Sequence, residues 1–339
     1  EYVPLAVNQK DMSVTTQFTM GALESLGLLK MDFLGLRTLT VLRDATDMIK
    51  EEHGVEIDID KINMEDPEVY GMISQGLTDG VFQLESEGMR NLMTQLKPEN
   101  LGDVMVGISL YRPGPMAKIP DYIAGKNDRH NIKYAHPILK KDLEDTYGCM
   151  VYQEKVMELV RDMAGYSLGR SDLVRRAMAK KKVDVMKKER EIFVYGGDGV
   201  PGAVKNGVPE KIAQNVFDQM MDFAEYAFNK SHACAYAVVS YQTAYLKKYF
   251  EPEFMTALLN SFITRSDKLA HYISYMQKAG ICVKPPHVNY SSAKFTVKDG
   301  SVRFGLYALK NVGEIVSKIV IEREKNGLYI DFEDFVSRN

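Results

Sequence analysis

The feature that most constrains the fold is a long succession of segments with helical spacing, which begins near Thr38 and continues through most of the chain. Their boundaries carry recognisable end signals: Asp66 stands at an N-cap position, Pro67 follows at the first helical position, and Gly76 ends the pattern. The periodicity predicts helices over residues 38–54, 65–76, 87–96, 100–111, 152–164, 171–181, 209–228, 233–250, 252–263 and 266–280.

Strand patterns are few by comparison. We predict strands over residues 79–86, 281–284, 294–297 and 301–306, and a glycine-rich surface loop over 195–210. The fold class is therefore expected to be mainly α. We expect three parts: a short strand-containing N-terminal part over 1–37, a helical body over 38–280, and a small mixed α/β tail over 281–339.

Composition limits the function classes. With 45% hydrophobic and 26% charged residues among 339, the chain is expected to be globular and soluble. Cys149, Cys234 and Cys282 show no paired spacing, which favours a reducing cytoplasm over disulfides or a zinc site. No signal peptide or membrane-spanning run is present. The chain starts without Met and stops in mid-pattern, so we expect a piece of a longer protein.

A basic block interrupts an otherwise balanced chain of net charge −3. Residues 170–190 hold nine basic and three acidic side chains, and the basic ones include Arg175, Arg176, Lys180, Lys181 and Lys182. Acidic partners at helical spacing look scarce, so the like charges favour phosphate binding through arginine forks and lysine point charges. The alternative is a solvated helix face.

A second polar group comes just before an aromatic-rich helix. Asn229, Lys230 and His232 precede Tyr236, a combination that suits a nucleotide because its phosphates attract cations and its base stacks on a flat ring. The aromatic residues further along this helix are equally compatible with core packing. A lone histidine here would more often be a packed or capping residue.

Two further motifs leave structural alternatives open. Arg112 precedes Pro113-Gly114-Pro115, a stiff turn that would fix where its guanidinium points, for a structural purpose or for a binding site. Residues 303–323 have the pattern of the first half of a helix-hairpin-helix, which offers backbone N–H groups to DNA phosphate. A plain strand-turn-helix fits the same residues.

Asp32 lies inside the apolar run "GLLKMDFLGL", which we predict to be a short buried strand. A buried carboxylate needs a partner. Lys30 or Arg37 could supply one, or Asp32 could be a metal ligand at a strand end, where Mg²⁺ needs more than one acidic ligand. Asp58 and Asp60 lie elsewhere in the sequence, and we do not assign them as further metal ligands. A metal-dependent hydrolase built on Asp32 is therefore not favoured, because it would lack ligands.

Six blocks resemble successive segments of the bacterial DNA polymerase III alpha subunit family, the C-family replicative polymerases. They are "LLKMDFLGLRTLTVLRDA", "GVFQLESEGM", "LYRPGPM", "TYGCMVYQEKVM", "GYSLGRSDLVRRAMAKKK" and "FNKSHACAYAVVSYQTAYLKKYFEPEFM". The resemblance covers nearly the whole chain in unbroken order.

This resemblance implies that residues 1–37 are the end of a palm, 38–280 the fingers, and 281–339 a segment leading into helix-hairpin-helix modules. Asp32 would be one of three Asp residues that hold two Mg²⁺ ions, with the other two upstream of residue 1. The basic block, Arg112 and residues 229–232 would face primer–template DNA and the incoming dNTP, and Tyr236 would stack on a base. One departure is Asn311-Val312-Gly313, where the family has Gly-x-Gly.

The implied partners are primer–template DNA, dNTP and the rest of the polymerase chain. The sliding clamp and other replisome subunits would bind through regions absent here, and no membrane is involved. With one of three acidic ligands, this chain alone is expected not to extend primers. The alternative functions are a non-catalytic DNA-binding module and a protein-interaction scaffold whose basic block meets an acidic partner.

Overall fold

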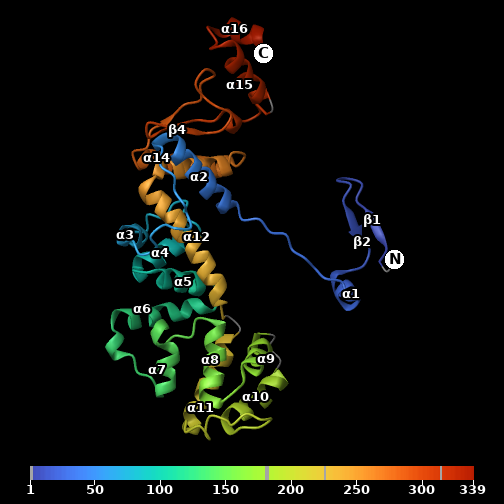
Figure 1. The fold of residues 1–339 in the computed structure, drawn as a ribbon, viewed down its shortest axis with the longest axis vertical. Helices are drawn as coiled ribbons and strands as arrows, with labels where there is room; N and C mark the ends of the chain where they lie inside the picture. Colours follow the sequence, from blue (N-terminus) through green and yellow to red (C-terminus); the bar gives the residue numbers. More distant parts are fainter. Residues whose placement is uncertain (1–2, 180–182, 225–226, 314) are drawn as a thin grey trace. The chain divides into compact units, whose positions relative to one another are not determined.

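The computed structural model describes residues 3–179, 183–224, 227–313 and 315–339. The chain divides into two compact units, residues 1–37 and 38–339, each of which is described by itself. Helices make up most of the described residues, with two small sheets (Figure 1), which confirms the expected mainly α fold. Within these residues no helix is long and apolar enough to cross a membrane.

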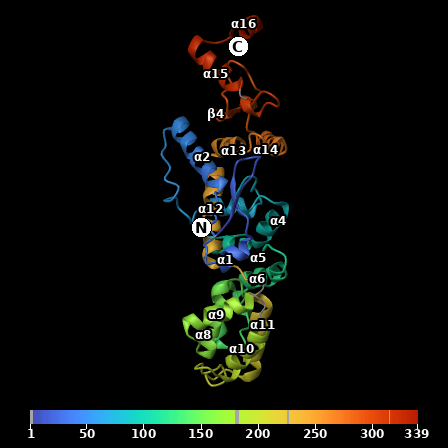
Figure 2. The same ribbon diagram turned by 90° about the vertical axis from the view of Figure 1, so that its right-hand side faces the viewer.

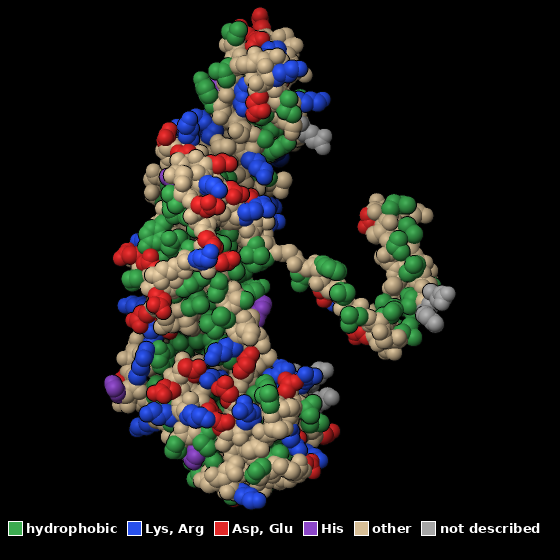
Figure 3. Space-filling model, viewed as in Figure 1, with side chains coloured by type: hydrophobic (Ala, Val, Ile, Leu, Met, Phe, Trp, Pro, Cys, Tyr) green, Lys and Arg blue, Asp and Glu red, His purple; other side chains and the backbone are tan. Residues whose placement is uncertain are grey.

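The first unit contains β1 (Leu5–Val7) paired antiparallel with β2 (Val14–Thr16), and then α1 (Met20–Ser25). The buried strand predicted around Asp32 is wrong. Residues 28–36 pair with no strand among the described residues, and Phe33 and Leu34 are 90% and 92% exposed. Figure 3 shows hydrophobic side chains along this unit. Because none of its described residues is buried, it offers no core for these side chains to enter.

The second unit opens with helices that match the predicted ones closely. These are α2 (Arg37–His53), α3 (Pro67–Ser74), α4 (Glu87–Leu96) and α5 (Leu101–Leu110). Asp66 caps α3 by accepting a hydrogen bond from the backbone N–H of Glu68 at 2.9 Å, as predicted. Ser86 and Asn100 cap α4 and α5 in the same way, which explains why these boundaries are readable from sequence.

The strand predicted over 79–86 is a tight turn instead. Val81 donates its backbone N–H to Thr78, and Leu84 donates to Val81, while the Thr78 hydroxyl donates to the Leu84 carbonyl at 2.7 Å. Gly80 has a φ of 75°, a conformation that suits a turn. Val81 and Leu84 are both buried, so these apolar residues belong to a turn that packs on the core.

A second group of helices shares one apolar core. It contains α7 (Pro137–Leu143), α8 (Gln153–Ala164), α9 (Leu168–Ala179), α10 (Val183–Tyr195) and α11 (Glu210–Ala224), and α6 (Ile119–Asn127) precedes it. Helix α9 begins before the predicted start at residue 171, and Ser171 lies within it and donates its hydroxyl to the Ser167 carbonyl at 2.6 Å. The loop predicted over 195–210 is present over 196–209, but its expected surface position is wrong for Val200, Ala203 and Val208, which are buried in this core.

The long helix α12 (Lys230–Tyr249) connects the cores of the second unit. It lies beside α5 in both views (Figures 1 and 2) and packs against α3, and it is followed by α13 (Glu251–Ser261), against which it also packs. Tyr241 of α12 is fully buried and donates its hydroxyl to the Asn63 carbonyl at 2.8 Å. Helix α14 (Ser266–Lys278) then packs against α13.

The C-terminal part holds the second sheet, in the order β3-β5-β4. Strand β3 (Val283–Lys284) is parallel to β5 (Ser301–Arg303), which is antiparallel to β4 (Thr296–Lys298), so all three predicted C-terminal strands are present in shortened form. Helices α15 (Ile315–Asn326) and α16 (Phe332–Arg338) follow.

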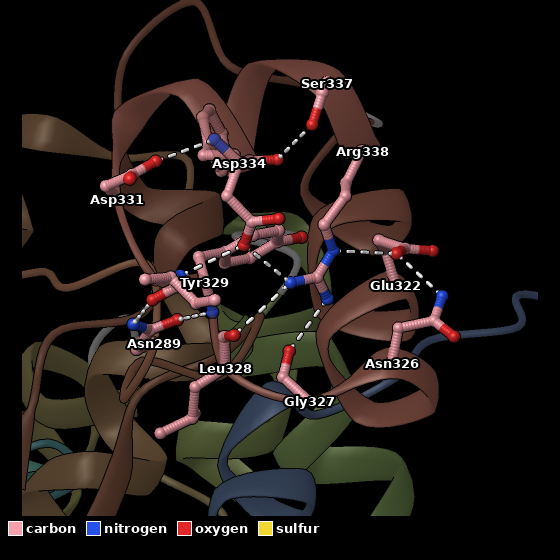
Figure 4. A network of polar contacts seen from close by, with 12 residues as sticks. Asn289, Glu322, Asn326, Gly327, Leu328, Tyr329, Asp331, Asp334, Ser337 and Arg338 are labelled. Carbon is pink, nitrogen blue, oxygen red and sulfur yellow. Dashed lines mark hydrogen bonds and ion pairs between the residues drawn. The ribbon is translucent and has the colours of Figure 1, made fainter.

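Arg338 ties α16 to the end of α15 (Figure 4). Its Nη2 donates to the Gly327 carbonyl at 2.8 Å, its Nε pairs with Glu322 at 3.1 Å, and its guanidinium lies 4.4 Å from the centre of the Tyr329 ring. One side chain therefore satisfies a carbonyl at the C-terminus of α15 and holds the helix pair together.

Candidate functional site

The start of α12 is fixed to the start of α8 by one carboxylate. Asn229 caps α12, accepting the backbone N–H of His232 at 2.9 Å. Glu154 accepts from the Asn229 side-chain amide at 2.9 Å and from the backbone N–H of Lys230 at 3.0 Å. The predicted Asn229–His232 group is therefore a helix N-terminus at which Glu154 accepts from the N–H of Lys230 and Asn229 accepts from the N–H of His232.

The ammonium group of Lys230 reaches over Tyr152. It lies 3.5 Å from Asp145 Oδ2 and 5.5 Å from the centre of the Tyr152 ring. Its side chain is 42% exposed. The contact with Asp145 is long and solvated, and such pairs contribute about 0–1 kcal/mol. A stronger anion could therefore replace Asp145 at little cost.

A row of rings and one guanidinium runs from Arg112 to Phe82. Arg112 lies 4.3 Å from the centre of the Phe228 ring, and Phe228 lies 5.3 Å from His232. His232 is 4.2 Å from Tyr236, which is in turn 5.2 Å from Phe82. The two predicted motifs, Arg112 and the Asn229–Tyr236 group, are thus brought together although more than a hundred positions separate them in sequence.

Arg112 leaves the end of α5 just before the predicted stiff turn. Gly114 has a φ of 104°, and Pro115 is buried at the start of the 3₁₀ helix η1 (Pro115–Lys118). The Arg112 Nε donates to the Ser109 carbonyl at 3.2 Å. Burial lowers the pKa of the Arg112 guanidinium, which stays charged because it begins far above neutrality.

Arg175 is joined to this row through Gln153. Its Nη1 donates to Gln153 Oε1 at 3.0 Å, and the Gln153 backbone N–H donates to the Phe228 carbonyl at 2.9 Å. Gln153 also donates its amide to the Ala227 carbonyl at 3.1 Å. Arg112, Arg175, Lys230, His232 and Tyr236 with their linkers Gln153, Glu154 and Phe228 form what we call the α8–α12 cluster.

The expected scarcity of acidic partners in the basic block is wrong. Asp172 pairs with both Arg175 at 2.7 Å and Arg176 at 2.6 Å, and the hydrogen bond from Arg175 lowers the pKa of Asp172. Glu189, another of the three acids of the block, pairs with Arg170 at 3.1 Å. Counting within the block missed two partners outside it: Asp198, in the loop after α10, pairs with Lys188, and Asp218 of α11 pairs with Arg190.

Arg176 nevertheless remains accessible, with 63% of its side chain exposed, whereas Arg175 is 25% exposed. The predicted residues Lys180, Lys181 and Lys182 lie outside the described residues. Gln153, Glu154 and Phe228 were not selected from sequence as site residues. The one available signal was an acidic residue in the first turn of α8, which is an ordinary feature of helices.

Asp32 lies apart from this arrangement in the sequence and belongs to the first unit. Its carboxylate pairs with Lys30 at 3.3 Å and is 61% exposed, as in the ion-pair alternative. No group of three or more His, Cys, Asp or Glu among the described residues is placed to hold a metal ion. The described residues around Asp32 therefore do not fit the two-Mg²⁺ site that the resemblance implies.

The C-terminal turn adopts the backbone that its sequence allows. Asn311 and Gly313 have φ values of 67° and 60°, so Asn311 takes the left-handed conformation that was expected to be tolerable there. Helix α15 follows, while residue 314 is outside the described part of the chain. The DNA contact at this turn stays a prediction.

Comparison with protein families assigns these parts in chain order. Residues 1–35 match the bacterial DNA polymerase III alpha NTPase domain, 38–199 match the finger domain of the same subunit, and 280–339 match a helix-hairpin-helix motif. The fold is thus of the type found in a bacterial replicative polymerase subunit.

Curated relatives agree over the full chain. It is 48% identical to the DNA polymerase III subunit alpha of Thermus aquaticus, 44% to that of Borreliella burgdorferi and 43% to that of Bacillus subtilis. In each case the match includes 100% of this chain and 28%, 29% or 30% of the relative's length. The chain belongs to the bacterial DNA polymerase III alpha subunit family, and it spans less than a third of these relatives.

Proposed function

We propose that this chain is the part of a template-directed DNA polymerase that binds primer–template DNA and the incoming dNTP. One observation carries the proposal. Lys230 is the first residue of α12, and two cations distant in sequence contact the segment that leads into this helix: Arg112 lies over the Phe228 ring, and Arg175 donates to Gln153, whose backbone N–H donates to the Phe228 carbonyl. A convergence of cations is what phosphate requires.

The phosphates would replace acidic side chains that now pair with these cations. Lys230 faces Asp145 and Arg176 faces Asp172, and both pairs are open to solvent. Since exposed pairs contribute only about 0–1 kcal/mol, exchange for a phosphate with several negative oxygens is favourable. Lys180, Lys181 and Lys182, which lie outside the described residues, would also bind phosphate, and Tyr236 would offer its ring to a base.

Asp32 would act as a metal ligand only together with two further Asp residues of the polymerase, which the resemblance places upstream of residue 1. The reaction of the whole polymerase would be attack of the primer 3′ oxygen on the α-phosphate of dNTP. We expect the 339-residue chain alone to bind DNA without extending a primer. Template-dependent extension by the purified chain would contradict this.

The test is fluorescence anisotropy of a labelled primer–template across a salt series, with unlabelled duplex as competitor. Arg176→Glu is the test variant, because the Arg176 side chain is 63% exposed and can be replaced without disturbing the core. Arg43→Glu is the matched control: its side chain is 67% exposed and pairs with a single aspartate, Asp44, at 2.7 Å. The proposal expects Arg176→Glu to weaken binding about tenfold and Arg43→Glu to leave it unchanged.

The protein-interaction alternative gives a different result in the same assay. A scaffold that recognises an acidic protein would bind DNA weakly. Its DNA affinity would fall by the same factor in Arg176→Glu and in Arg43→Glu. Binding through phosphate contacts predicts that log Kd changes with log salt by about 0.9 for each phosphate contacted in duplex DNA. A reduction of that slope in Arg176→Glu alone would assign the phosphate contact to Arg176. No binding at low salt would overturn the proposal for this chain.

A further inference from the structure

A cavity of about 740 Å³ is lined by residues of the 3₁₀ helix η1, of the segment that follows α6, and of helices α7 and α11. None of the α8–α12 cluster lines it. Its walls are aromatic and aliphatic, formed by Ile132, Tyr134, Leu143, Tyr147, Ile212 and Phe223. A volume of this size matches sites that enclose a small organic molecule.

The walls are held in place by contacts of their own. The Tyr147 hydroxyl accepts a hydrogen bond from Arg129 at 2.9 Å, and its ring packs edge-on against Tyr122 at 5.0 Å. Leu143 is buried at the end of α7. The cavity is therefore preformed, so a ligand would not have to pay for ordering its walls.

The rim carries more positive than negative charge. Lys118, Lys133 and Lys211 line it, against Asp121 and Asp222. Lys118 already pairs with Asp121 at 3.5 Å. Lys133 and Lys211, which are both exposed, stand at the entrance to an apolar interior. This combination fits a ligand with an apolar body and one anionic group.

We propose that this cavity binds an amphipathic monoanion, an aryl or acyl carboxylate or sulfonate, with its apolar body among the aromatic walls and its anionic group between Lys133 and Lys211. The site is separate from the proposed DNA surface. Cys149 lines the cavity and is otherwise buried, so an occupant would cover its thiol.

The probe is 1-anilinonaphthalene-8-sulfonate, and its uncharged counterpart is N-phenyl-1-naphthylamine. We expect saturable one-to-one binding of the sulfonate by fluorescence titration of the 339-residue chain. Ala135 is exposed and lines the cavity, so Ala135→Trp should fill the space without disturbing the core and should abolish this binding. Fluorescence that persists in Ala135→Trp would place the probe on other apolar surfaces and overturn the proposal.

The anion specificity is tested separately. Lys133→Glu combined with Lys211→Glu should weaken the sulfonate about tenfold and leave the neutral amine unchanged, because only the former carries a charge near the rim. Lys140→Glu is the control, since this exposed lysine of α7 does not line the cavity. Equal loss for both probes, or equal loss in the control, would contradict the assignment of the anionic group.

Protection of Cys149 gives a readout tied to the site. Burial raises the pKa of the Cys149 thiol to about 11, so alkylation is slow even without ligand. Saturating sulfonate should slow it at least fivefold further by peptide mass spectrometry, while exposed Cys282 reacts at an unchanged rate. Unprotected Cys149 at saturation would show that the probe binds elsewhere.

Discussion

Arg175 of α9 donates a hydrogen bond to Gln153 Oε1 at the start of α8, with 3.0 Å between Nη1 and Oε1. Gln153 in turn donates its backbone N–H and its side-chain amide to the carbonyls of Phe228 and Ala227. The guanidinium is therefore fixed relative to the segment that enters α12. An arginine of the basic block thus acts as a structural part of the site as well as a charge.

Gln153→Ala should loosen this junction. It leaves the Ala227 carbonyl and one Arg175 N–H without their partners, which costs about 1–3 kcal/mol for buried groups and less where water enters. We expect a lower thermal unfolding midpoint and weaker DNA binding in the anisotropy assay.

Gln214→Ala is the matched control, because the Gln214 side chain also makes two hydrogen bonds, donating to Tyr195 and Glu210, but on an exposed face of α11. A loss of DNA affinity in Gln214→Ala as large as in Gln153→Ala would show that the junction has no special role.

Because Lys126 and Asp103 form a buried ion pair, removing one partner should destabilise the fold more than removing both. The two side chains are 6% and 2% exposed and lie 2.8 Å apart. Lys126 also donates to the Leu96 and Lys97 carbonyls, at the end of α4. Removing Asp103 alone, as in Asp103→Leu, leaves a buried ammonium and should lower the free energy of unfolding by about 3–5 kcal/mol.

The combination Asp103→Leu with Lys126→Met should recover part of that loss, because no buried charge remains unpaired. Urea unfolding of the single and double variants measures the coupling. Strictly additive losses would mean that the two side chains do not depend on each other.

Much of the helical body could be predicted from sequence because its signals are local. Asp66, Ser86 and Asn100 cap helices whose starts agree with the predicted ones to within a few residues. The tight turn over 79–86 was misread, since the burial of Val81 and Leu84 depends on helices distant in sequence. Apolar character alone does not distinguish a buried turn from a strand.

Several residues of the candidate site could be selected from sequence, but their contacts with one another could not. Arg112, Lys230 and Tyr236 were selected for their chemistry, yet only the fold shows that Phe228 and His232 join them. The partners of the basic block were underestimated for the same reason. Asp198 and Asp218 pair with its cations from across a loop and from another helix, a relation that spacing along one helix does not reveal.

Gly305→Ala should destabilise the C-terminal sheet. A Cβ on Gly305 would come within 2.4 Å of the Phe295 backbone nitrogen and the Lys294 carbonyl carbon, neither of which can move aside cheaply. We expect the free energy of unfolding to fall by about 1–3 kcal/mol or more, the range found for overpacked sites.

Gly169→Ala is the opposite case and serves as its control. Gly169 lies in α9 with open space where a Cβ would be. Since alanine is favoured over glycine in a helix by about 1 kcal/mol, this variant should be as stable as the original chain or more so. Differential scanning calorimetry compares the two, and a neutral Gly305→Ala would contradict the close packing at the sheet.

We expect the stability of the fold to depend on pH through the carboxyl group of Asp142. Burial, and then the neighbouring carboxylate of Asp162, raise its pKa to about 6 from a usual 3.8, although Lys141 acts in the opposite direction. Its Oδ2 is buried with no hydrogen-bond partner among the described residues. Between about pH 4 and pH 6 the folded chain holds a proton that the unfolded chain has lost. Stability associated with Asp142 is therefore present below pH 4 and is lost as the pH rises through 6.

Asp142→Asn keeps the side chain neutral at every pH, so it should unfold at a higher temperature than the original chain at pH 7 by roughly 2–4 °C. The advantage should vanish near pH 4, where Asp142 is itself protonated in the fold. Asp121→Asn, at a side chain that is 63% exposed, is the control and should show no such change with pH. Thermal unfolding at pH 4, 5, 6 and 7 measures the trend. An Asp142→Asn advantage that is constant across this range would show that the carboxyl group of Asp142 does not titrate there.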